Sequence, residues 1–227
     1  MSPKKRPKSL VNLIILYQKE GDNMKKNKMD IVFLLDKSGS MSGSESDTIG
    51  GYNSFLKKEK KNNCESLVTT VLFDNSYSRI VDRVEISKVK NLTEGDYYVG
   101  GCTALYDAIG KTITEMDKNK PDKVLFVITT DGLENASVEY SKQNIKSMIK
   151  KHKNYEFIFL GAGIDSYSEG ASIGIKRSNI SNYSKSKKGI ENMFRAVNKA
   201  SEMMYYDKLD ESWKDELSNY IEDNKEQ

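Results

Sequence analysis

Three oxygen-bearing side chains stand at alternate positions of one short segment, Asp36-Lys37-Ser38-Gly39-Ser40. The segment directly follows the apolar run Ile31–Leu35, which is typical of a buried strand. One carboxylate and two alcohols make a poor acid–base pair, but they suit a hard divalent cation, which prefers oxygen ligands. The segment therefore predicts part of a cation site at the point where a strand leaves the core.

Two later segments could supply further oxygens. The first, Gly100–Asp107, places Thr103 just before an apolar pattern with helical spacing, so Thr103 could also be a simple helix cap. The second, Thr129–Asn135, follows another apolar run and contains Asp131, which could also belong to a simple Asp-Gly turn. For each segment alone, the structural interpretation (a helix cap at Thr103, an Asp-Gly turn at Asp131) is at least as good as a metal-binding one. Taken together, the three segments supply two carboxylates and three hydroxyls.

The rest of the chain predicts strands and helices in alternation. Strands are expected at 30–35, 66–73, 124–129 and 157–160, with an antiparallel edge strand at 77–81. Helices are expected at 44–60 (with a capping box at its start), 105–116, 138–149 and 190–204. This order predicts a doubly wound α/β fold, with a mostly parallel central sheet, one antiparallel edge strand and helices on both faces. Such sheets bind ligands beyond the carboxyl ends of their strands, where the three oxygen-bearing segments would meet.

In this combination and order, the segments resemble the von Willebrand factor A (VWA) family, also called integrin I-like domains. The resemblance covers roughly Met29 to Tyr206. It rests on an Asp-x-Ser-x-Ser element, a later Thr and a later Asp, which form the metal-ion-dependent adhesion site (MIDAS) of that family. The corresponding positions here are Asp36, Ser38, Ser40, Thr103 and Asp131.

The resemblance implies a divalent-metal-dependent protein-binding module and not an enzyme. The hydroxyls of Ser38, Ser40 and Thr103 would touch Mg²⁺ or Mn²⁺ directly, and the two aspartates would act mainly through water. The cation would remain electron-poor, so an Asp or Glu carboxylate of a partner protein could take the open position. Movement of Asp131 into direct contact would weaken that binding. A Mg²⁺-dependent hydrolase on a similar Rossmann-like sheet remains the alternative, although no base is evident near Ser38 or Ser40.

Composition narrows the choice of partner and compartment. The net charge of +3 belongs to residues 1–23, which hold five basic and two acidic side chains, so no nucleic-acid partner is expected for the neutral remainder. Cys64 and Cys102 fit a reducing compartment, and Cys102 is expected to be a packed loop residue. The single histidine, His152, is expected at a solvated helix end, and zinc chemistry is therefore disfavoured.

These features favour a cytoplasmic protein of a bacterium or its phage, without membrane contact. The apolar stretch Leu10–Tyr17 is too short to span a bilayer and lacks a cleavage site after it. An ATPase or a stress-response component would be a suitable acidic partner in that compartment. A surface adhesin remains the alternative within the family.

We predict three parts in the chain. Residues 1–28 form an N-terminal extension, and we expect translation to start at Met24 because Lys19–Gly21 can be encoded by a purine-rich ribosome-binding sequence. Residues 29–206 form the VWA domain. Residues 207–227 carry eight acidic and three lysine side chains and predict an acidic amphipathic helix. Its apolar stripe, which would either dock on the domain or bind a partner, consists of Leu209, Trp213, Leu217, Tyr220 and Ile221.

Overall fold

The structure, a computed structural model, describes residues 28–62, 65–206 and 208–223, and its centre is a six-stranded sheet. The strands are β1 (Met29–Asp36), β2 (Ser66–Phe73), β3 (Tyr77–Glu85), β4 (Val124–Thr130), β5 (Tyr155–Gly161) and β6 (Ile180–Asn182). Their order is β3-β2-β1-β4-β5-β6, and every neighbouring pair is parallel except β2 and β3. The predicted doubly wound α/β fold, with its antiparallel edge strand, is confirmed.

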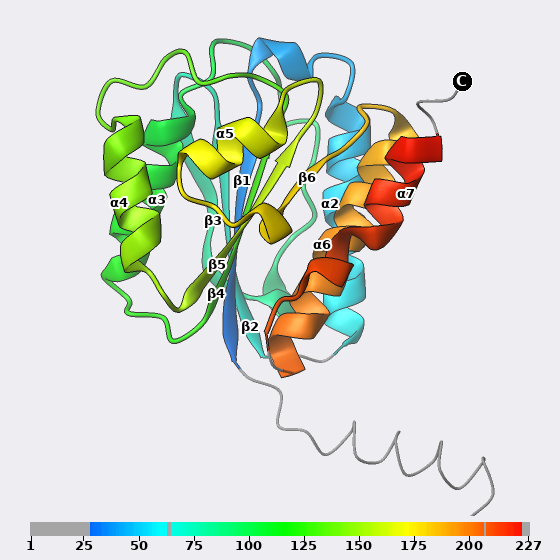
Figure 1. Cartoon of the computed structure of the whole chain (residues 1–227). Coiled ribbons are helices and arrows are strands. Elements are labelled where there is room, and N and C mark those ends of the chain that lie inside the picture. Colours follow the sequence, from blue (N-terminus) through cyan, green and yellow to red (C-terminus); the bar gives the residue numbers. More distant parts are fainter. Residues whose placement is uncertain (1–27, 63–64, 207, 224–227) are drawn as a thin grey trace, which may run out of the picture.

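Helices cover both faces of the sheet (Figure 1). One layer contains α3 (Leu105–Asp117), α4 (Lys142–Lys151) and α5 (Ser166–Ser172), and the other contains α2 (Glu45–Lys61), α6 (Lys187–Tyr206) and α7 (Asp215–Asp223). Successive side chains of β1 point to opposite faces, so that Phe33 joins one apolar core and Leu34 joins the other. Because both faces are covered, β1 is apolar from Ile31 to Leu35 and not at alternate positions.

The chain order of the strands reverses at β1, which lies between β2 and β4. Asp36 pairs in register with Phe73 of β2, and Leu35 pairs with Thr129 of β4. The carboxyl ends of three strands therefore meet at one edge of the sheet. Ligand sites of open α/β sheets lie at such a reversal.

Some boundaries differ from the sequence-based predictions. Helix α4 does not begin near Val138, whose side chain is 89% exposed. It begins at Lys142, because Ser141 and Asn144 form its capping box. The predicted capping box at Ser44 is wrong, because that side chain makes no capping hydrogen bond, although α2 does follow it. Strand β6 and helix α5 were not predicted, and at three and seven residues they are too short for periodicity to reveal.

Two predictions concern residues outside the described ranges. They are the N-terminal extension up to residue 27, with its start at Met24, and the state of Cys64. Among the described residues, none of the helices combines the length and the apolar character needed to cross a membrane.

Helix α2 approaches α6 closely through a glycine. A Cβ atom added to Gly51 would lie 2.3 Å from the Cδ2 atom of Phe194, so a larger residue there would collide with the Phe194 ring. This contact accounts for a helical glycine that costs about 1 kcal/mol relative to alanine. The preceding Gly50 faces open space.

The C-terminal segment docks on the domain through the predicted apolar stripe. Trp213, in the short 3-10 helix η4 (Glu211–Lys214), is 1% exposed, and Leu217 of α7 is 0% exposed. The Trp213 indole N–H donates to the Ser178 carbonyl at 3.0 Å, and the Lys214 ammonium donates to the Ile180 carbonyl at 2.9 Å. These contacts attach the segment to the edge strand β6 and to the turn before it.

Glu59 is a carboxylate buried between α2 and α6, with 0% exposure. Its Oε2 atom accepts hydrogen bonds from the hydroxyls of Ser201 at 3.0 Å and Tyr205 at 2.9 Å. Its Oε1 atom has no hydrogen-bond partner among the described residues. Burial raises the pKa of Glu59 above its ordinary value, against the opposing effect of the two hydrogen bonds.

We expect Glu59→Gln to remove a pH dependence of stability. Because the pKa of Glu59 is higher in the folded state, the free energy of unfolding of the wild type should fall as pH rises from about 4.5 through the raised pKa. Glutamine keeps an acceptor for both hydroxyls without a charge, so the variant should be more stable by about 1 kcal/mol at alkaline pH. Urea unfolding at several pH values measures this difference. Glu94→Gln, at an exposed position outside α2 and α6, is the control, and identical pH profiles for wild type and Glu59→Gln would contradict the prediction.

Candidate metal site

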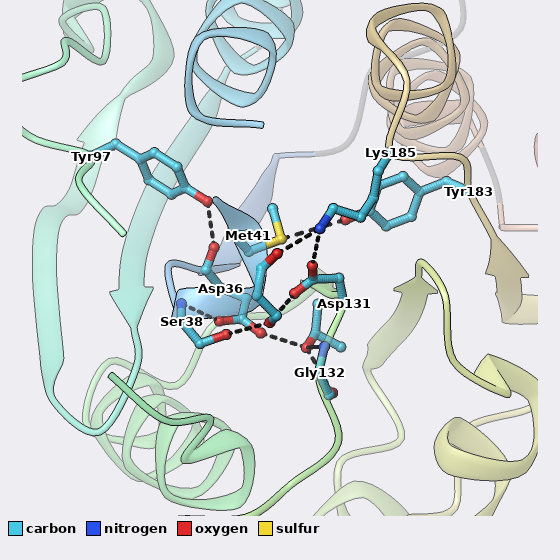
Figure 2. Close-up of polar contacts among 10 residues, drawn as sticks. Asp36, Ser38, Met41, Tyr97, Asp131, Gly132, Tyr183 and Lys185 are labelled. Carbon is cyan, nitrogen blue, oxygen red and sulfur yellow. Dashed lines mark hydrogen bonds and ion pairs between the residues drawn. The ribbon is translucent and has the colours of Figure 1, made fainter. Parts of the chain in front are cut away.

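The aspartate and the two serines of the Asp-x-Ser-x-Ser segment lie at the carboxyl end of β1, next to Asp131 after β4 (Figure 2). The hydroxyl oxygens of Ser38 and Ser40 are 3.1 Å apart. The Ser40 hydroxyl donates to Oδ1 of Asp131 at 2.5 Å. Residues 91 positions apart in the chain thus contact each other directly, as the parallel sheet predicts.

Thr103 reaches the same place from the loop before α3. A Cβ atom added to Gly132 would lie 2.6 Å from Thr103 Oγ1 and 3.4 Å from Ser40 Oγ, so both hydroxyls border the space that this glycine leaves open. Thr103 is not the N-cap of α3. That position is Ala104, and no side chain caps it, so the plainer interpretation of Thr103 is wrong. The structure therefore brings all five predicted residues to one location.

Hydrogen bonds between the loops fix this arrangement. The Gly39 N–H donates to the Gly101 carbonyl at 3.1 Å. The Asn135 N–H donates to the Thr103 carbonyl at 3.0 Å, and the Asn135 side chain accepts in return from the Thr103 N–H at 2.9 Å. The three loops hold one another in place, so the site is preorganised.

Asp36 is fully buried at the base of the site. Its Oδ1 atom accepts from the Ser38 N–H at 2.7 Å, and its Oδ2 atom accepts from the Thr130 hydroxyl at 2.6 Å. Burial raises the pKa of Asp36, the hydrogen bonds lower it, and the neighbouring charge of Asp131 raises it again. Two adjacent carboxylates with little solvent require positive charge nearby.

Lys185 supplies one such charge. Its Nζ atom lies 2.7 Å from Oδ2 of Asp131 and donates to the Ser40 carbonyl at 2.5 Å (Figure 2). This lysine lies between β6 and α6, 54 positions after Asp131. Sequence reasoning missed it, because the strand that places it has three residues and no periodic signal.

Lys37 has a separate structural role. It is 3% exposed, and its ammonium forms an ion pair with Asp74 in the loop after β2. Although burial opposes the change, hydrogen bonds from Lys37 and Ser76 hold the pKa of Asp74 below its ordinary value. The ion pair fastens the Asp-x-Ser-x-Ser segment to the neighbouring loop.

The donor atoms fit a hard divalent cation. Two Mg²⁺ ligands at about 2.1 Å on adjacent corners of an octahedron are about 3.0 Å apart, which is close to the 3.1 Å between the Ser38 and Ser40 oxygens. Ser40 donates its proton to Asp131 and so keeps lone pairs for a cation. Over the described ranges, no three or more His, Cys, Asp or Glu side chains gather as a metal-binding cluster, so the candidate ligands here are mainly hydroxyls.

Searches against protein-family models and against curated proteins find no match, but solved structures match the fold. Proximal thread matrix protein 1 from the mussel byssus, with a zinc-occupied MIDAS motif, has a TM-score of 0.57 and 17% identity, and the match covers 76% of this chain and 45% of that one. The PilB minor pilin of Streptococcus sanguinis has a TM-score of 0.58 and 13% identity, covering 77% and 61%. A von Willebrand factor type A protein of Catenulispora acidiphila has a TM-score of 0.56 and 13% identity, covering 78% and 43%. The chain has a VWA fold.

The VWA fold accounts for the central sheet and the helices on its two faces, and this part of the predicted resemblance is confirmed. Identities of 13% to 17% with these proteins establish the fold alone. The chain spans between 43% and 61% of the length of these three structures.

Two further residues singled out in the sequence lie outside the candidate metal site. Cys102 was predicted to be packed but is exposed, because its neighbour Thr103 takes the inward direction. His152 ends α4 as predicted, but its ring is only 11% exposed and not solvated. Its two nitrogens lie 2.7 Å from the Met148 carbonyl and 2.7 Å from the Asp117 carboxylate.

Proposed function

We propose that this protein is a divalent-cation-dependent binding module for a protein partner that presents an Asp or Glu side chain. One observation carries the proposal, namely the convergence of three hydroxyls and two carboxylates at the sheet edge, with Ser40 exposed to solvent. The hydroxyls of Ser38, Ser40 and Thr103 would hold Mg²⁺ or Mn²⁺ directly. A cation held mainly by neutral oxygens supplies a Lewis-acidic position for a carboxylate from another molecule.

The hydrogen bonds of the two aspartates support an indirect role for them. Each oxygen of Asp36 already accepts a hydrogen bond, one from Ser38 and one from Thr130. Each oxygen of Asp131 also does so, one from Ser40 and one from Lys185. These donors offset part of the negative charge, which favours contact with a cation through water.

Binding without catalysis is the function that we infer from the groups around the site. The one histidine of the chain, His152, precedes β5 and so lies at the opposite edge of the sheet. Burial raises the pKa values of the nearby Tyr97 and Tyr183, so both remain protonated and neither serves as a base.

The neutral charge of residues 24–227 favours a protein partner over nucleic acid. We propose that the partner is a cytoplasmic protein, such as an ATPase or a stress-response component.

Calorimetric titration with Mg²⁺ and Mn²⁺ tests the site. The wild type should bind at least one of the two ions, and Gly132→Ala should weaken binding by about 10–100-fold, because its methyl group would displace the Thr103 hydroxyl. Gly50→Ala is the matched control, because a Cβ atom there meets nothing within 4 Å.

The next step is to add acetate to the Mn²⁺-loaded protein and to follow water-proton relaxation, which reports displacement of bound water by a carboxylate. Acetate should displace water from the wild type. Wild-type protein that binds neither ion at millimolar concentration would refute the proposal. Metal-dependent hydrolysis of p-nitrophenyl phosphate that disappears in Gly132→Ala would favour the hydrolase instead.

A further inference from the structure

We propose that Lys185 is a positioning residue, which holds Asp131 out of direct contact with the bound cation and so keeps that cation receptive to a partner's carboxylate. This inference rests on the proposed function of the site. It adds to that function a residue from the β6–α6 connection, outside the three loops that carry the predicted ligands.

Asp131 is held through both of its oxygens. Oδ1 accepts from the Ser40 hydroxyl at 2.5 Å, and Oδ2 lies 2.7 Å from the Lys185 ammonium. The Asp131 side chain is only 3% exposed, so the protein and not water must balance its charge. Lys185 is the one ion-pair partner of Asp131 in the part of the chain that the structure describes. Because the same ammonium also donates to the Ser40 carbonyl, it ties the β4 loop to the β1 loop.

The backbone on both sides of Lys185 is anchored. The preceding Tyr183 is 4% exposed and packs with the apolar core of the α2, α6 and α7 face. The Ser186 hydroxyl accepts from the Gly189 N–H at 3.1 Å and lies 3.2 Å from the hydroxyl of Tyr220 on α7. The ammonium is therefore presented from a fixed turn, supported by the docked C-terminal helix.

A positive charge in this place should have two opposite effects. It repels the divalent cation and already pairs with the Asp131 carboxylate, so it weakens metal binding. It also keeps Asp131 from donating charge to the metal, so it strengthens the attraction of the metal for an external carboxylate. Removal of the Lys185 charge should therefore tighten metal binding and weaken carboxylate binding together. A residue with a merely structural role would not change the two affinities in opposite directions.

The test compares Lys185→Met, which keeps most of the side-chain length, with Lys185→Arg, which keeps the charge. Lys187→Met is the control, because Lys187 is exposed at the start of α6 and forms no ion pair with Asp131. Calorimetry gives the Mn²⁺ affinity of each variant, and water-proton relaxation gives the acetate affinity of its Mn²⁺ complex. For Lys185→Met we expect Mn²⁺ affinity to rise about tenfold and acetate affinity to fall about tenfold. Lys185→Arg and Lys187→Met should stay close to the wild type in both.

The outcomes separate this inference from the proposed function. If the wild type binds Mn²⁺ and Lys185→Met binds Mn²⁺ and acetate as the wild type does, the role of Lys185 is overturned and the proposed function stands. If Lys185→Met binds Mn²⁺ more tightly and acetate equally well or better, Lys185 is only a competitor of the cation, and the inference is again wrong. If the wild type binds neither Mn²⁺ nor Mg²⁺, the proposed function and this inference both fail.

Discussion

Asp36→Asn should abolish cation binding and at the same time make the cation-free protein more stable. Asparagine keeps an acceptor for the Ser38 N–H but removes a charge at a fully buried position. Burial already raises the pKa of Asp36, which indicates that its charge is unfavourable there without a cation. The Thr130 hydroxyl has a second acceptor in the Gly132 carbonyl at 3.1 Å, so it is not left unpaired. We expect a gain of about 1–3 kcal/mol in chelator and a loss of at least ~100-fold in metal affinity.

Thermal unfolding in chelator and in millimolar Mg²⁺ measures both parts of this prediction. Added metal should raise the melting temperature of the wild type and leave that of Asp36→Asn unchanged, because only a folded state that binds metal is stabilised by it. In chelator, the advantage of the variant should grow as pH rises through the pKa of Asp36 and vanish at acidic pH, where the wild-type carboxyl is neutral. Asp122→Asn, at an exposed position, is the control. A variant that retains wild-type metal affinity would exclude Asp36 from the site.

Trp213→Ala should destabilise the protein strongly, although Trp213 lies outside the predicted VWA domain. Its side chain is 1% exposed, belongs to the core of the α2, α6 and α7 face, and hydrogen-bonds to the Ser178 carbonyl. Truncation of a buried tryptophan costs about 3–5 kcal/mol. For a chain of this size, the melting temperature should fall by roughly 10 °C. Deletion of residues 207–227 should have a larger effect, because it also removes Leu217 and the contacts of Lys214.

Glu216→Ala is the control for the C-terminal segment. Glu216 pairs with Arg195 on the surface, where the two side chains are 65% and 57% exposed, so its loss should change stability by less than about 1 kcal/mol. Calorimetric melting of all three variants makes the comparison. Unchanged stability after deletion of the segment would contradict docking and favour its alternative role as a partner-binding helix.

Much of the fold could be predicted from the sequence, because the signals are local. The apolar run at 31–35 and its counterparts at 66–73 and 124–129 are long enough to indicate strands buried on both faces. The segments that contain Asp36 and Asp131 lie directly at the ends of strands, and in a parallel sheet the carboxyl ends of strands meet at one edge. Asp36, Ser38 and Asp131 could therefore be placed together before any coordinates were known.

Other features have no local signal. The short elements α5 and β6 escaped prediction because a few residues carry no periodicity. The onset of α4 was placed too early, because the exposed Val138 continued an apolar spacing that the cap at Ser141 overrides. Gly51 is a poor helix residue by propensity, and only its contact with Phe194 explains it.

The sequence alone determined the order of the longer strands and helices, the sheet type and the five oxygen-bearing candidates. Only the tertiary structure decided that Thr103 is not a helix cap, that the C-terminal stripe docks, and that Lys185 lies against Asp131. The physical reason is distance along the chain. A cap or a strand depends on neighbouring residues, whereas the Lys185–Asp131 contact depends on the registers of β4, β5 and β6 and on the helices that hold their connections in place.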